Sequence, residues 1–291
     1  MAGTSPAMTI RTVVVKAILI VPGIACAQQR PDMSSSEIST PAVAPAPSLR
    51  APRVWKFWGT GLWGLLAFAA MFAGQFAVLV FLLIGKGATF DIDSMSAVAG
   101  SGTTISLSVM MGLPAVLAIL WLATRLSRTP FADYLALRRM PWRDLLIGVA
   151  GLIVLVAGWE LLSRVLGRGA APGFMVDVLK SAQADGALWL LVIAFAVAAP
   201  ITEELMVRGF LYRGWSESFL GPVGAIALSS LVWTAMHVQY YDWFLFAEVL
   251  SIGFLLGYMR YRSNSTWLTI VMHGLNNLVA TLQSVGLAGQ S

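Results

Sequence analysis

Long apolar runs alternate along the chain with short segments that hold most of the charged residues. A helix of about 20 residues crosses a hydrocarbon core of about 30 Å, and seven runs reach that length. The runs begin near Trp58, Ile105, Leu145, Leu188, Val223, Phe244 and Trp267. None shows the alternation over about ten residues that is typical of an outer-membrane barrel strand. The pattern predicts an all-α fold, a polytopic membrane helical bundle of about seven transmembrane helices.

The composition of the chain supports the same fold class. Of the 291 residues, 58% are hydrophobic and only 11% are charged, whereas about 25% of the residues of a typical soluble domain are charged. We therefore expect an integral membrane protein that is surrounded by the lipid bilayer. The single cysteine, Cys26, excludes an intramolecular disulfide and a zinc site built from several thiolates.

Lys and Arg are unevenly distributed between alternate loops, and short cytoplasmic loops carry an excess of both. If the segment before the first span is cytoplasmic, the outer loops hold only Lys86, Arg164, Arg168 and Lys180. The inner segments then hold Arg50, Arg53, Lys56, Arg125, Arg128, Arg138, Arg139, Arg143, Arg208, Arg213, Arg260 and Arg262. This asymmetry predicts a cytoplasmic N-terminus and a C-terminus outside. The basic residues form no continuous stripe, so we expect no nucleic-acid partner.

Residues 1–50 differ from the rest of the chain. The segment TIRTVVVKAILIVPGIACAQQ has two positive charges, an apolar stretch and a small-residue end, which together resemble a secretory signal peptide. Alternatively, translation starts at Met33 and residues 1–32 are absent from the mature protein. The Pro-rich residues that follow are typical of a disordered segment. We expect residues 1–50 to be a disordered or signal-like extension and residues 51–291 to form one transmembrane helical domain.

A few ionisable residues interrupt the last apolar runs. A carboxylate or an imidazole is costly inside a bilayer, so it usually faces a partner or a wet cavity. Glu203 and Glu204 end the fourth run, while the only two histidines of the chain, His237 and His273, lie in the fifth and seventh. The amide Asn277 follows in the seventh run. We expect these five side chains to meet in one polar cavity.

Helical spacing separates the roles of the two carboxylates. Glu204 and Arg208 are four residues apart, with the carboxylate first, so they lie on one helix face and can form an ion pair. Glu203 is rotated by about 100° from Glu204 and has no cation at that spacing. We expect Glu203 to be the free base and the ion pair to support the helix end.

The histidines and the amide suggest hydrolytic chemistry. A carboxylate and an imidazole that share a water molecule can remove its proton, so His237 is expected to act with Glu203. His273 and Asn277 are four residues apart on one helix face, and both side chains can donate to a developing oxyanion. Glu203, His237 and His273 would equally suit a catalytic Zn²⁺ with an open position. Spacing does not separate the two chemistries, since the HExxH signature of zinc proteases is absent from the sequence.

The depths of the two histidines conflict with a shared cavity. If the fifth helix begins near Gly221 at the cytoplasmic face, His237 lies about 24 Å along it at about 1.5 Å per residue. His273 lies only about 10 Å from Thr266 by the same measure. We therefore expect the fifth helix to begin outside the hydrocarbon, to tilt strongly or to be partly re-entrant.

Three motifs in this part of the chain resemble those of the CAAX protease and bacteriocin-processing (CPBP) family of intramembrane endopeptidases, which includes the type II CAAX prenyl endopeptidases. The family motifs are EExxxR, FxxxH and HxxxN or HxxxD. The corresponding segments here are Glu203-Glu204-Leu-Met-Val-Arg208, Trp233-Thr-Ala-Met-His237 and His273-Gly-Leu-Asn-Asn277. Trp233 replaces the usual Phe, which should alter packing near His237 without removing a catalytic group.

The resemblance implies a protease-like domain that hydrolyses a peptide bond of a membrane-associated protein or peptide, prenylated CAAX-type substrates included. It assigns water activation to Glu203 and His237, oxyanion binding to His273 and Asn277, and support to the ion pair of Glu204. Family members are described both as metalloproteases and as metal-free, glutamate-dependent enzymes, so Zn²⁺ stays open as a cofactor.

Two interpretations from other classes remain. A transporter could use the same polar residues as a proton relay, but its spans should show inverted repeats or matching broken helices, and only the break at Pro200 is visible. An immunity or scaffold protein of the same fold, without catalysis, is the second alternative.

Overall fold

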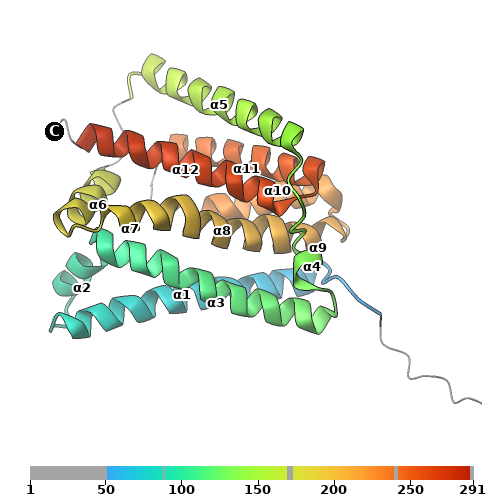
Figure 1. Cartoon of the computed structure of the whole chain (residues 1–291), viewed down its shortest axis with the longest axis horizontal. Coiled ribbons are helices and arrows are strands. Elements are labelled where there is room, and N and C mark those ends of the chain that lie inside the picture. The colour runs from blue at the N-terminus through green and yellow to red at the C-terminus, as the bar shows by residue number, and fades with distance from the viewer. Residues whose placement is uncertain (1–50, 88, 169–172, 239–241, 289–291) are drawn as a thin grey trace, which may run out of the picture. The chain divides into compact units, whose positions relative to one another are not determined.

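The structure, a computed structural model, describes residues 51–87, 89–168, 173–238 and 242–288 (Figure 1). The predictions for residues 1–50 lie outside the described residues. The helices are α1 Phe57–Gly85, α2 Ile92–Ala99, α3 Gly102–Ser127, α4 Phe131–Tyr134, α5 Trp142–Val165, α6 Gly173–Ala184, α7 Leu188–Ile193, η1 Ala194–Ala198, α8 Ala199–Glu204, η2 Leu205–Leu211, α9 Tyr212–Ser216, α10 Gly221–Ala235, α11 Trp243–Ser263 and α12 Thr266–Ala288. No strand occurs among these described residues, so the all-α prediction is confirmed.

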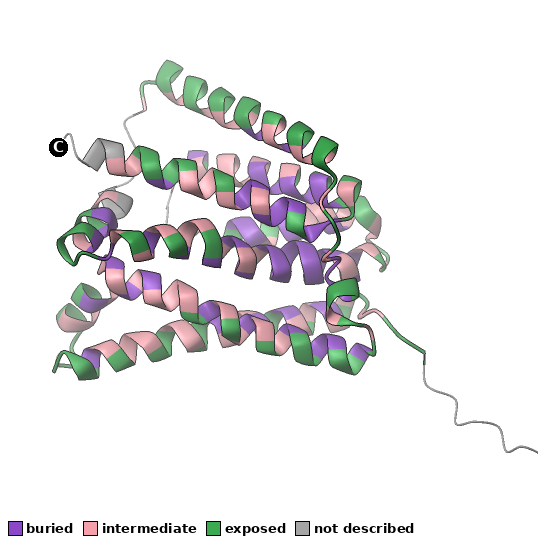
Figure 2. Cartoon of the chain, in the orientation of Figure 1, coloured by how far each residue is buried: buried purple, intermediate pink, exposed green. Residues whose placement is uncertain are grey.

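Five helical segments are long and apolar enough to cross a membrane: Phe57–Gly85, Gly102–Ser127, Trp142–Val165, Leu188–Ser216 and Trp243–Ser263. Helix α12, with 23 residues, also exceeds the length of about 20 residues that a crossing needs. Many positions along these helices are exposed (Figure 2). Large apolar side chains are among the exposed residues, as expected for surfaces that face lipid tails. The chain is an integral membrane protein with a polytopic helical bundle.

The fifth predicted span is shorter than a full crossing. Helix α10 has 15 residues, which extend over only about 22 Å at about 1.5 Å per residue. It starts at Gly221, whose φ of +61° favours glycine, and Pro222 occupies its first turn. The apolar run therefore contains a short helix, because hydropathy reports the apolar character of a run and not where its helix ends.

The segment from Leu188 to Ser216 is the central helix of the bundle. Half of its most apolar stretch is buried, compared with 11% to 39% for the other four candidate spans. The helix passes through α7, η1, α8, η2 and α9 without leaving helical geometry, but η1 and η2 are wide π-helical turns. Such turns are rare and frequently accompany functional sites.

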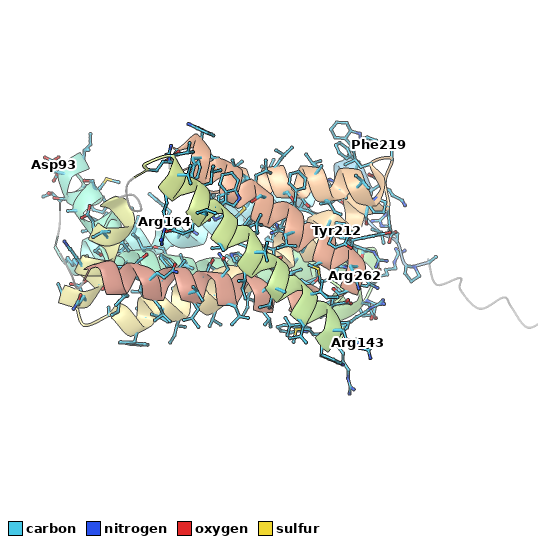
Figure 3. All side chains as sticks on the ribbon, turned by 90° about the horizontal axis from the view of Figure 1, so that it is seen from above. Asp93, Arg143, Arg164, Tyr212, Phe219 and Arg262 are labelled. Carbon is cyan, nitrogen blue, oxygen red and sulfur yellow. The ribbon has the colours of Figure 1, made fainter. Side chains whose placement is uncertain are left out.

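The basic loops gather at one end of the bundle. Arg53 N donates to Ser127 O at 3.0 Å, which joins the segment before α1 to the end of α3. Arg262, at the end of α11, pairs with Asp144 at the start of α5 at 2.9 Å. Figure 3 shows Arg262 at this end and Asp93 at the opposite end. The alternation of the spans therefore places these basic segments on one side of the membrane, and their assignment to the cytoplasm remains a prediction.

Candidate functional site

The central helix is interrupted just before its two carboxylates. In η1 the N–H of Ala199 bonds to Ala194 O, five residues back. Pro200 follows, and because proline has no N–H, it cannot provide the next bond of this series to Phe195 O. Phe195 O therefore needs a donor from another helix. The short helix α8 then presents Glu203 and Glu204 at its end.

Helix α12 supplies the missing donor. Asn277 Nδ2 donates to Phe195 O at 3.0 Å. Gly274 lies one turn earlier, and a Cβ added there would lie 2.7 Å from Ala196 O, so only glycine allows this approach. The segment from His273 to Asn277 thus docks α12 against the broken part of the central helix. The oxyanion role expected of Asn277 stays a prediction, since its amide here holds a backbone carbonyl.

Glu204 and Arg208 form the predicted ion pair. Arg208 Nη1 donates to Glu204 Oε1 at 2.8 Å, and both side chains are fully buried. Arg208 Nη2 also donates to Gly253 O at 3.1 Å, which ties the pair to α11. His273 Nδ1 lies 3.1 Å from the same carboxylate oxygen. Glu204 is therefore an anchor that joins the central helix to α11 and α12.

Glu203 has different surroundings from its neighbour. Its Oε2 accepts a hydrogen bond of 2.6 Å from Trp233 Nε1, on α10. Glu203 also lines a cavity of about 260 Å³ together with His237, while Phe68 and Met71 of α1 belong to its apolar wall. Of the five side chains expected to share one polar cavity, Glu203 and His237 line it, whereas Glu204, His273 and Asn277 do not. Trp233 is the direct partner of the Glu203 carboxylate.

Trp233 also joins the two histidines. Its indole centroid lies 4.9 Å from the ring of His237 and 5.3 Å from the ring of His273, both in edge-to-face geometry. Arg208 lies over the same indole, with Cζ 4.7 Å from the ring centroid. The indole of Trp233 therefore links the two histidine rings, while the depth of each histidine in the membrane stays a prediction. His273 is almost completely buried and does not line the cavity.

Hydrogen bonds fix the tautomers of both histidines. His237 Nδ1 lies 2.9 Å from Trp233 O, and because a carbonyl only accepts, this nitrogen carries the proton. His273 Nδ1 carries a proton for the same reason, since it faces the carboxylate of Glu204. Nε2 of each neutral ring is then an acceptor. His273 could donate to an oxyanion only when its ring is protonated.

A polar residue that the sequence analysis missed lines the same cavity. Gln75 of α1 faces the space that Glu203 and His237 share. The other uncharged polar side chain of the lining, Thr202, donates its hydroxyl to Ala198 O at 2.7 Å. Gln75 is therefore the lining residue best suited to give a neutral hydrogen bond to a ligand. The sequence did carry a signal, because an amide in the middle of an apolar run is costly in a bilayer.

The arrangement does not fit a zinc ion. Among the described residues, no three side chains of His, Cys, Asp or Glu lie close enough together to hold a metal. Trp233 occupies one oxygen of Glu203, and Nδ1 of His273 faces Glu204. The expected ligands Glu203, His237 and His273 therefore do not converge as a catalytic zinc site requires.

Comparisons with known proteins support the resemblance drawn from the three motifs. Residues 185–279 match the family described as Type II CAAX prenyl endopeptidase Rce1-like. The matched region extends from just before α7 into α12 and includes every residue of the three motifs. The match covers about a third of the chain, and it agrees with the resemblance that the three motifs carry.

Two relatives extend the comparison. A protein of Escherichia coli described as "Uncharacterized 24.3 kDa protein" is 26% identical over 197 residues, which cover 65% of this chain and 86% of that protein. The "UPF0177 protein YbdI" of Lactococcus lactis is 30% identical over 94 residues, which cover 32% of this chain and 49% of that protein. The chain thus spans about half the length of the second relative. No solved structure matches the chain.

Proposed function

We propose that this protein is an intramembrane endopeptidase that hydrolyses a peptide bond of a membrane-associated protein or peptide. The observation that carries the proposal is the shared cavity of Glu203 and His237. A carboxylate and an imidazole in one cavity within a membrane helix bundle are costly unless they serve a ligand or water. The family match over residues 185–279 supports the same class of reaction.

In the proposed reaction, Glu203 takes a proton from a water molecule in the cavity. The water oxygen forms a bond to the carbonyl carbon of the substrate, and the carbonyl oxygen takes the negative charge. Collapse of this intermediate breaks the C–N bond, and the proton passes from Glu203 to the leaving nitrogen. His237, which lines the same cavity, orients the attacking water by a hydrogen bond.

The developing oxyanion needs a donor inside the cavity. Gln75 of α1 lines the cavity and carries such a donor. His273 and Asn277, the donors expected from the motifs, are bound to Glu204 and Phe195 and lie outside the lining. We propose that Gln75 donates to the oxyanion and that His273 and Asn277 hold the central helix in position for Glu203. Direct donation to the oxyanion by His273 and Asn277 would require a protonated His273 ring and a shift of α12.

The apolar wall of the cavity favours a substrate that arrives from the bilayer. It consists of side chains from α1, α3, the central helix and the end of α10: Phe68, Met71, Phe72, Val109, Ala199 and Met236. Phe72 is also exposed, on a helix of membrane-spanning length. A volume of about 260 Å³ holds several water molecules, since each occupies about 30 Å³ in the liquid. The cavity can therefore hold the nucleophile beside an extended backbone.

The proposal is tested with the purified full chain in detergent and with peptides tethered to a lipid anchor, some prenylated at a C-terminal cysteine and some not. Cleavage in H₂¹⁸O should place one ¹⁸O atom in the new carboxylate, as read by mass spectrometry. Parallel reactions contain a chelator, and added Zn²⁺ follows in a second step. Loss of cleavage on chelation with recovery by Zn²⁺ would contradict the metal-free mechanism, and no cleavage of any tethered peptide would contradict the enzymatic class.

A further inference from the structure

A second cavity, of about 310 Å³, lies where α3 ends and the chain turns toward α4. It shares no lining residue with the cavity of Glu203. Arg125 and Arg128 supply its charged lining, and Trp121 and Phe131 supply aromatic walls. We refer to it as the arginine notch.

The backbone at the end of α3 shapes the notch. Arg128 caps the helix in the left-handed conformation, with φ of +60°. Glycine or asparagine normally occupies this position, because other side chains are strained there. The cap reverses the chain over Thr129 and Pro130 into α4, so the walls of the notch are formed by the last turns of one helix and the first residue of the next. Because glycine would be less strained at this position, the presence of an arginine suggests a functional role for the guanidinium of Arg128.

The charge of the notch is not neutralised by the described residues. No acidic side chain belongs to the lining, and neither Arg125 nor Arg128 forms an ion pair within the described part of the chain. Arg213 and Arg262, in contrast, pair with Glu217 and Asp144 at 2.6 and 2.9 Å. Two guanidinium groups that line one cavity without a carboxylate attract an anion.

The position of the notch at the end of a helix of membrane-spanning length should bring it to the level of the phospholipid headgroups. Helix α3 is long and apolar enough to cross a membrane, and Arg125 and Arg128 end it. Trp121 precedes Arg125 by four residues, so both lie on one helix face, and Trp121 is 57% exposed. Tryptophan is enriched at the level of the headgroups. Leu122 and Leu126 are exposed beside it and offer an apolar surface to acyl chains.

We propose that the arginine notch binds the phosphate group of an anionic phospholipid. Arginine binds phosphate oxygens through two parallel N–H donors, and basic pockets on the cytoplasmic side of membrane bundles recognise anionic headgroups. Arg125 and Arg128 contact the phosphate, and the glycerol and acyl chains lie along Trp121 and the adjacent leucines. The site is independent of the proposed peptide hydrolysis.

The test measures lipid binding to the delipidated full chain in detergent by native mass spectrometry. The probes are short-chain phosphatidylglycerol, phosphatidylcholine with the same chains, and inorganic phosphate as competitor. We expect one phosphatidylglycerol to bind at least tenfold more tightly than phosphatidylcholine, without displacement by millimolar phosphate. Equal binding of both lipids would overturn the proposal, and displacement by phosphate would show that the notch binds free anions and not a lipid.

Variants separate the notch from general charge attraction. Arg125→Gln with Arg128→Gln should weaken phosphatidylglycerol binding at least tenfold, whereas Arg138→Gln with Arg139→Gln, which removes the same charge from exposed residues outside the notch, should not. Arg128→Gly is a further variant that relieves the left-handed backbone. It should fold at least as well as wild type and still bind the lipid more weakly. Equal losses in the two double variants, or full binding by Arg128→Gly, would overturn the proposal.

Discussion

Glu203 and Glu204 are adjacent in the chain, but their carboxylates have opposite surroundings. Glu203 accepts a hydrogen bond from Trp233 and lines a cavity with His237. Glu204 is fully buried and binds Arg208 and His273. Because successive helical residues are rotated by about 100°, the two carboxylates point to different sides of the helix. Glu203 can therefore reach a substrate, whereas Glu204 holds three helices together. The predictions for the two residues therefore differ in kind.

Loss of the Glu204 carboxylate should lower the stability of the folded protein. Glu204→Ala leaves the buried guanidinium of Arg208 without its counter-charge, and breaking such a pair costs about 3–5 kcal/mol. We expect a marked fall in the melting temperature of the protein in detergent. The matched control is Glu160→Ala, which breaks an exposed pair with Arg164 at the same four-residue spacing and should cost less than about 1 kcal/mol. Equal falls for both variants would show that Glu204 is not an anchor.

Trp233 should tolerate phenylalanine better than alanine. Trp233→Phe removes the N–H that binds Glu203 but keeps an aromatic ring between His237 and His273. The resembling family usually has phenylalanine at this position, so we expect folding to be retained and the cleavage rate to change by less than about tenfold, that is by less than about 1.4 kcal/mol. Trp233→Ala leaves a void that costs about 3–5 kcal/mol. The melting temperatures and cleavage rates of both variants test this prediction. If Trp233→Phe loses as much stability and activity as Trp233→Ala, the prediction is contradicted.

Gly274 should not accept a side chain. In Gly274→Ala the new Cβ meets the backbone oxygen Ala196 O at 2.7 Å, and forced overpacking of this kind costs about 1–3 kcal/mol. Gly158→Ala is the control, because a Cβ there meets nothing within 4 Å and should be neutral or stabilising by up to about 1 kcal/mol. Thermal unfolding of the two variants measures the difference. A Gly274 variant as stable as the Gly158 variant would mean that α12 does not dock on η1 as described.

The amide of Gln75 should matter for the rate and not for the fold. Gln75→Leu keeps a similar volume but removes the donor proposed for the oxyanion, and the loss of one such donor slows the chemical step about 10²- to 10³-fold. The change should appear in kcat, with little change in melting temperature. Gln183→Leu, at an exposed position of α6, is the control for the same substitution. An unchanged kcat in Gln75→Leu would return the oxyanion role to His273 and Asn277.

The parts of the site that depend on local geometry could be predicted from the sequence. The four-residue spacing of Glu204 and Arg208 is enough to place both on one helix face, and the pair is present at 2.8 Å. The cost of isolated polar groups in a bilayer predicts one cavity for all five polar side chains, but only Glu203 and His237 line it.

Partners on different helices could not be predicted in the same way. The spacing of His273 and Asn277 gives a shared face, but Asn277 bonds to Phe195 O because Pro200 leaves that carbonyl without a donor. No periodicity in the sequence marks the π turns η1 and η2, and Pro200 is the only local sign of the first. The length of α10 could not be predicted either, since an apolar run does not show where its helix ends.

The most direct test of the account is the cleavage rate of Glu203→Gln against wild type, with Glu248→Gln as the matched control. Glu248 is a half-buried carboxylate of the membrane helix α11 that does not line the cavity. We predict that Glu203→Gln retains its melting temperature but slows peptide hydrolysis by about 10²- to 10⁴-fold, the usual contribution of a general base, while Glu248→Gln cleaves at the wild-type rate. A folded Glu203→Gln variant that cleaves as fast as wild type would contradict the assignment of Glu203 as the base.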